Sequence, residues 1–189
     1  VLIINKQSQW ALDLPNIQSP NLLNSQLSMS KIYEDNSLAI GNTPLVKLHS
    51  ITKNAKATVL AKIEGRNPAY SVKCRIGANM IWEAEKSGSL NKEKTIIEPT
   101  SGNTGVGLAI VAAQRGYDCI FVMTDKVSPE KVDLLRAYGA EVIVCPIDVE
   151  PDDPRSYYST AERLANETPN AFRPNQYANP VNPISHYST

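Results

Sequence analysis

The sequence has 189 residues, of which 42% are hydrophobic, so the chain is long and apolar enough to form a domain with a buried core. Nineteen Lys and Arg residues balance nineteen Asp and Glu residues and no apolar run is long enough to cross a membrane, so neither nucleic acid nor a membrane is an expected partner. Cys74, Cys119 and Cys145 are widely spaced and only two histidines are present, so we expect no disulfide framework, no metal site and a reducing, cytoplasmic location.

Residues 1–28 differ in composition from the rest of the chain. Asn, Gln, Ser and Leu dominate this segment, and Pro15 and Pro20 interrupt any helical or strand period. We therefore expect a poorly ordered extension, with the folded protein beginning at Met29.

From Ile40 onward, short β-rich runs alternate with longer helical patterns, which is typical of an α/β fold with a largely parallel sheet. The expected strands are residues 58–64, 95–98, 119–123 and 141–145. The expected helices are residues 72–87, a segment that ends at Arg115, a segment that Ser128 opens and Gly139 ends, and residues 155–167. Ser128 is expected to cap the third of these helices with its hydroxyl, and Pro129 to occupy its first position. Residues 168–189 contain four prolines and are expected to be loop-like.

The segment Asn67-Pro68-Ala69-Tyr70-Ser71-Val72-Lys73 places a lysine at the start of a predicted helix. The positive end of the helix dipole disfavours the ammonium form there, and a neutral amine is a good nucleophile for a carbonyl group. From its position alone, Lys73 could equally be an ordinary charged side chain in solvent, which is the role of most lysines.

The segment Glu98-Pro99-Thr100-Ser101-Gly102-Asn103-Thr104-Gly105 connects a predicted strand to a predicted helix. Hydroxyls, an amide and backbone N–H groups at one helix start can bind a carboxylate or a phosphate. The same residues also suit an ordinary capped turn. The glycine spacing is neither that of a dinucleotide-binding turn nor that of a P-loop.

Together, these two segments resemble a known family. NPAYSVKCRIGANMIWEAEKSG is similar to the cofactor-lysine helix of bacterial O-acetylserine sulfhydrylase, the A-type cysteine synthase, and PTSGNTG to the substrate-carboxylate loop of that family. MSKIYEDNSLAIGNTPLVKL matches the start of those enzymes. DKVSPEKVDLLRAYGAEVIVCP, DPRSYYSTAERL and NQYANPVNPISHY are closer to bacterial cystathionine β-synthase. The resemblance covers about residues 29–189.

The resemblance implies specific roles. Lys73 would form a Schiff base with pyridoxal phosphate and later remove the substrate α-proton. Asn103 would hydrogen-bond the ring oxygen of the cofactor. The implied ligands of the substrate carboxylate are Thr100, Ser101, Gly102, Thr104 and Gln176. Cys74, which the A-type enzymes share, is expected to be a packed, unreactive thiol.

The resemblance also implies a tryptophan synthase β-like fold, present as an incomplete fragment. Residues from about 70 to 150 would form the smaller mobile domain. Residues 29–69 and 151–189 would form the start of the larger domain or the link to it. The family's loop for the cofactor phosphate is not found in this sequence, so we expect the 189 residues to bind the cofactor weakly at most.

The implied function is cysteine synthesis from O-acetylserine and sulfide. Cystathionine formation from serine and homocysteine is the alternative within the family. An alternative of another class is an inactive fragment or binding module that holds an amino acid or an acidic C-terminus. The implied partners are a small amino-acid substrate, a second copy in a homodimer, and the C-terminus of serine acetyltransferase.

Overall fold

A parallel four-stranded sheet organises residues 64–189 in the computed structural model, which describes residues 2–4 and 31–189. Its strands are β4 (Thr95–Pro99), β5 (Cys119–Thr124), β6 (Glu141–Cys145) and β7 (Ala171–Phe172), in the order β6-β5-β4-β7. Every neighbouring pair is parallel, with Ile97 opposite Ile120 and Phe121 opposite Val142. The α/β fold with a parallel sheet is therefore confirmed.

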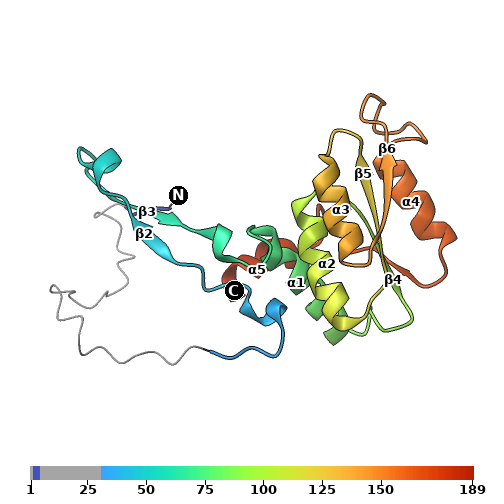
Figure 1. Cartoon of the computed structure of the whole chain (residues 1–189), viewed down its shortest axis with the longest axis horizontal. Coiled ribbons are helices and arrows are strands. Elements are labelled where there is room, and N and C mark those ends of the chain that lie inside the picture. The colour runs from blue at the N-terminus through green and yellow to red at the C-terminus, as the bar shows by residue number, and fades with distance from the viewer. Residues whose placement is uncertain (1, 5–30) are drawn as a thin grey trace. The chain divides into compact units, whose positions relative to one another are not determined.

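Helices cover both faces of this sheet (Figure 1). The helices are α1 (Lys73–Lys86), α2 (Asn103–Arg115), α3 (Pro129–Ala137), α4 (Tyr157–Glu167) and α5 (Val181–Ser188). Because successive residues of a strand point to opposite faces, β5 contributes to two cores. Phe121 and Met123 join the larger core with α1, α2 and α3, whereas Val122 packs with Ala161 of α4.

Two glycines allow α1 and α2 to cross at very short range. A β-carbon added to Gly77 would lie 2.5 Å from the carbonyl carbon of Gly107, and one added to Gly107 would lie 2.6 Å from the carbonyl oxygen of Lys73. No side chain fits between backbones at this separation. The glycines therefore place Lys73 beside the first turns of α2.

A second unit comprises residues 1–34 and 43–63 and contains an antiparallel sheet in the order β1-β3-β2. Its strands are β1 (Leu2–Ile4), β2 (Leu45–Lys47) and β3 (Thr58–Lys62). Leu2 lies opposite Leu60, and Leu45 lies opposite Lys62. The remainder of the extension expected over residues 1–28 lies outside the described residues. Residues 35–42 and 64–189 form the other unit.

The loop-like character expected for residues 168–189 is wrong. Ala171–Phe172 forms β7 at the edge of the sheet, and Val181–Ser188 forms α5, which packs against α1. Pro183 occupies the first turn of α5, where an N–H has no partner within the helix, so a proline does not prevent helix formation. Pairing with β4 and packing on α1 stabilise two short elements that no local pattern indicates.

The start of α3 is only partly as predicted. Pro129 occupies the first helical position, but the Ser128 hydroxyl accepts no hydrogen bond from the helix. Hydrogen bonds to the Glu130 carboxyl group, first from its own backbone N–H and then from the side chain of Ser128, lower the pKa of that group. The boundary was therefore predicted correctly, whereas the capping contact was not.

Candidate functional site

The turn between β4 and α2 is shaped by one buried hydroxyl. Thr100 Oγ1 accepts hydrogen bonds from the N–H groups of Gly102 and Gly105, at 3.2 and 3.1 Å. Gly102 has φ 140° and ψ −81°, a conformation that L side chains rarely adopt. Ser101 and Asn103 remain exposed on either side of this glycine. The turn therefore presents polar groups at the start of α2.

Gln176 lies against the same turn although it is remote in sequence. Thr104 Oγ1 donates to Gln176 Oε1 at 2.7 Å, and Gln176 Nε2 donates to the Pro99 carbonyl at 3.3 Å. Both side chains are buried. The structure thus brings together the residues that the family resemblance assigns to the substrate carboxylate.

Glu98 anchors this arrangement and was not assigned a role from the sequence. Its carboxylate accepts the N–H groups of Asn175 and Gln176, both at 2.9 Å, and its side chain is completely buried. Burial raises the pKa of Glu98, and the two N–H donors oppose that rise. An acidic residue inside an otherwise apolar strand was the signal that could have identified it.

Lys73 begins α1, with its side chain half-buried and its N–H donating to Ser71 Oγ at 3.1 Å. Its backbone lies against Gly107, one turn after Asn103 on α2. The neighbouring Cys74 is buried, its Sγ accepts from the Ala69 N–H at 3.3 Å, and burial raises the pKa of its thiol. The prediction of a packed Cys74 is confirmed.

A buried ion pair positions the segment before Lys73. Arg75 is 2% exposed, and its Nε lies 2.8 Å from Glu64 Oε2. Asn67 donates to the same carboxylate at 2.9 Å and accepts from the Gly41 N–H at 2.9 Å. These bonds place the Asn67 end of the segment, whereas Tyr70 is 83% exposed.

A cavity of about 400 Å³ opens on the α3 side of the turn. It lies where β4, β5 and β6 end, which is where open parallel sheets bind ligands. Its lining consists of Ser101, Thr124, Lys126, Val127, Ser128, Lys131, Ile147 and Tyr157. Lys131, which the sequence analysis did not single out, approaches Gly102 closely: a β-carbon there would lie 3.1 Å from Lys131 Nζ.

None of the helices within residues 2–4 and 31–189 has the length and apolar character that a membrane span requires. Within the same ranges, no three His, Cys, Asp or Glu side chains are grouped so that they could hold a metal ion.

Known proteins similar to this chain share its fold and much of its sequence. A family model described as pyridoxal-phosphate dependent enzyme matches residues 36–189. Cystathionine β-synthase of Rattus norvegicus is 48% identical over 180 residues, covering 94% of this chain and 32% of that protein. Cysteine synthase of Buchnera aphidicola is 49% identical over 166 residues, covering 85% of this chain and 48% of that protein. The chain thus spans about a third to a half of these relatives.

Two solved structures confirm the expected fold class. A hydrogen sulfide-producing enzyme from Fusobacterium nucleatum superposes with a TM-score of 0.76 at 40% identity, covering 85% of this chain and 51% of that one. An O-acetylserine dependent cystathionine β-synthase from Helicobacter pylori gives a TM-score of 0.75 at 37% identity, covering 85% and 52%. The chain therefore belongs to the family of pyridoxal-phosphate dependent enzymes.

Proposed function

We propose that the complete protein catalyses β-replacement, in which a thiol or sulfide displaces the substituent on the β-carbon of serine or O-acetylserine. The observation that carries this proposal is the position of Lys73 beside the first turns of α2, next to a turn rich in hydrogen-bond donors. An amino-acid substrate requires an amine for the cofactor and a turn that can bind its carboxylate.

The residues at this helix start fit pyridoxal phosphate and an amino acid. Gly107 has no side chain that could keep Lys73 away from α2, and Asn103 is exposed at the first position of that helix. Bound pyridoxal phosphate supplies the delocalisation that stabilises negative charge on the substrate α-carbon. In the proposed assignment, Lys73 holds the cofactor and then takes the α-proton at Nζ, while Asn103 donates to the ring oxygen.

The substrate carboxylate is assigned to the turn itself. The hydroxyls of Thr100 and Ser101 and the backbone of Gly102 and Thr104 lie at the start of α2, where the helix dipole favours negative charge. Gln176 supports this assignment because it is hydrogen-bonded to Thr104. A carboxylate held here would fix the α-carbon near Lys73.

The sulfur nucleophile defines the specific reaction. Cysteine formation from O-acetylserine and sulfide is the prediction from the lysine helix. Cystathionine formation is the second candidate, and it is favoured by the 48% identity with the rat enzyme over 180 residues. Assembly as a homodimer, docking of serine acetyltransferase and a cytoplasmic location accompany the proposal as expectations. An inactive binding module is the alternative if turnover is absent.

The test is Lys73→Ala in the complete protein, with Lys86→Ala as the matched control. Lys86 lies at the other end of the same helix, is 77% exposed and pairs with Glu83. We expect Lys73→Ala to lose the visible absorbance of bound cofactor and all turnover, and Lys86→Ala to keep both. Retained absorbance in Lys73→Ala would show that another lysine holds the cofactor. O-acetylserine with sulfide and serine with homocysteine then separate the two reactions.

A further inference from the structure

Two consecutive backbone N–H groups hold the buried carboxylate of Glu98. Its Oε2 accepts from Asn175 and its Oε1 from Gln176, both at 2.9 Å. Among residues 2–4 and 31–189, the salt bridges do not include Glu98. Consecutive N–H groups that converge on one anion form a nest, which binds negative charge through backbone dipoles. The carboxylate is thus held mainly by the backbone of the segment that carries Gln176.

The nest requires an unusual backbone conformation at Asn175. This residue has φ 52°, in the left-handed region that L residues rarely adopt and that asparagine tolerates better than most. Its side chain is exposed, so packing of that side chain does not enforce the conformation. The two bonds to Glu98 therefore stabilise a turn that costs the chain free energy.

The side chain of Gln176 is bonded to the turn between β4 and α2. Its Oε1 accepts from the Thr104 hydroxyl at 2.7 Å, and its Nε2 donates to the Pro99 carbonyl at 3.3 Å. An amide nitrogen has two hydrogens, so Nε2 can also donate to a ligand. Because Glu98 and Pro99 are adjacent in β4, the backbone and the side chain of Gln176 are fixed to the same strand end.

Only a carboxylate suits both N–H groups of the nest. A glutamine at position 98 would offer one acceptor oxygen and an amide nitrogen, and that nitrogen would face an N–H group. A buried N–H group left unpaired costs free energy. Burial also disfavours the charge of Glu98 and raises its pKa, so an apolar residue would be easier to accommodate in this strand. The acid is therefore better explained by the position it gives to the segment than by stability.

We propose that Glu98 is a positioning residue for the substrate carboxylate: by binding the nest of Asn175 and Gln176, it holds the Gln176 amide where that carboxylate docks. This inference rests on the proposed function, in which the turn after β4 receives the α-carboxylate of an amino acid. Glu98 itself touches no substrate. It fixes the backbone of Gln176, and the Gln176 amide keeps a donor beside Thr104.

The binding test uses L-alanine and the complete protein with its cofactor. L-alanine carries an α-carboxylate but no substituent that can leave its β-carbon, so calorimetric titration measures binding alone. We expect Glu98→Gln to raise the Kd of L-alanine about tenfold, because the nest loses one of its two acceptors. The Kd of pyridoxal phosphate should stay within about twofold. In turnover, the KM for the amino-acid substrate should rise about tenfold and kcat should change less than about threefold.

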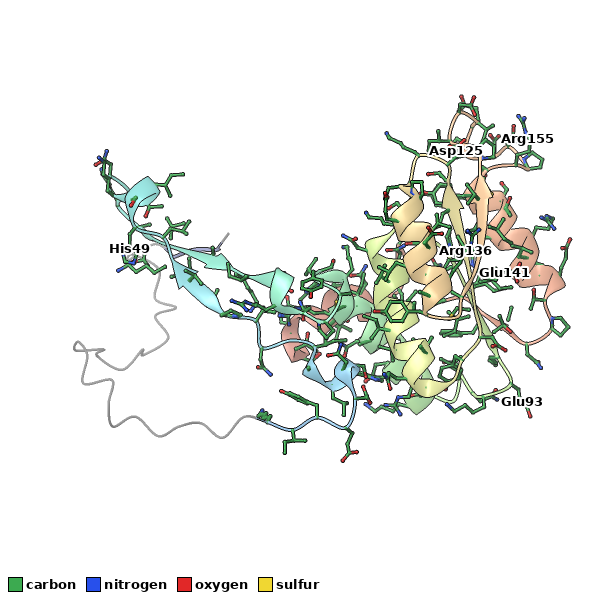
Figure 2. All side chains as sticks on the ribbon, viewed as in Figure 1. His49, Glu93, Asp125, Arg136, Glu141 and Arg155 are labelled. Carbon is green, nitrogen blue, oxygen red and sulfur yellow. The ribbon has the colours of Figure 1, made fainter. Side chains whose placement is uncertain are left out.

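Glu141→Gln is the matched control for the lost charge. Glu141 is labelled in Figure 2, begins β6 and is exposed. It belongs to the same parallel sheet as Glu98 but lies at the edge where strands begin, whereas the turn follows the end of β4. This variant should leave the Kd of L-alanine and the KM of the substrate unchanged.

A second pair of variants tests the nest without changing Glu98. Asn175→Ala places a residue that tolerates the left-handed region less well at φ 52°, so the nest should open and the Kd of L-alanine should rise about fivefold. Asn170→Ala is its control, because Asn170 is also exposed and has φ 57° but lies outside the nest. That control should bind L-alanine within about twofold of the wild type. This pair decides the question if Glu98→Gln does not fold.

The binding results separate this inference from the proposed function. Weaker L-alanine binding with unchanged cofactor affinity supports the role of Glu98 even if the complete protein catalyses no β-replacement. An unchanged Kd of L-alanine in Glu98→Gln would overturn the inference even if O-acetylserine is turned over normally. Equal losses of L-alanine and cofactor affinity, or no binding of L-alanine to the wild type, would also overturn it.

Discussion

From the close crossing of α1 and α2 we predict how much stability the substitution Gly107→Ala removes. The new β-carbon would lie 2.6 Å from the Lys73 carbonyl oxygen, whereas ordinary contact begins near 3.4 Å, so the backbones must separate. Overpacking of this kind costs about 3 kcal/mol at the upper end of its usual range, and the helix propensity of alanine offsets about 1 kcal/mol. We therefore expect the free energy of unfolding to fall by about 2 kcal/mol.

The assay is equilibrium urea unfolding of the complete protein, together with a titration of the cofactor. Gly65→Ala is the control, because nothing lies within 4 Å of its added β-carbon and its φ is not positive. That variant should stay within about 0.5 kcal/mol of the wild type. Because the separation moves Lys73, Gly107→Ala should also bind the cofactor more weakly. If the Gly107→Ala protein is as stable as the Gly65→Ala protein, the close crossing of α1 and α2 does not determine the position of Lys73.

Three further predictions concern the buried polar groups. Gln176→Ala leaves the Thr104 hydroxyl without its 2.7 Å partner, so the KM for the amino-acid substrate should rise about tenfold; an unchanged KM would remove Gln176 from the site. Because the pKa of Glu98 is higher in the folded than in the unfolded protein, its protonated side chain stabilises the fold at low pH. This stabilisation is complete below about pH 4.3, the pKa of an unfolded-state Glu, and is lost as the pH rises through the folded-state pKa. The stability difference between wild type and Glu98→Gln should therefore narrow with rising pH in thermal unfolding, and a constant difference would contradict this. Arg75→Leu leaves the partly buried Glu64 carboxylate without its guanidinium partner and should cost about 3 kcal/mol in urea unfolding, whereas a loss below about 1 kcal/mol would show that the ion pair contributes little.

Local sequence was sufficient for the order and type of most elements in residues 64–167. Runs such as Cys119–Thr124 are buried on both faces of the sheet, so their continuous apolar character predicts a strand directly. Pro129 lies at the first position of α3, where its fixed φ suits a helix start. Gly116 ends α2 in the left-handed conformation that glycine permits. Both lie where the sequence predicted them. The candidate turn and Lys73 were also visible in sequence, because their residue types are unusual for folding alone.

Tertiary structure decided which of these residues meet. The contact of Gln176 with Thr104 depends on β7 pairing with β4 and on Glu98 accepting the N–H groups of Asn175 and Gln176, and neither interaction has a local signal. The approach of Lys131 to Gly102 likewise depends on how α3 packs beside α2. Periodicity and capping report interactions within a few residues, whereas these contacts join segments about 30 to 80 residues apart. The position of Lys131 beside the turn could therefore be identified only from the tertiary structure.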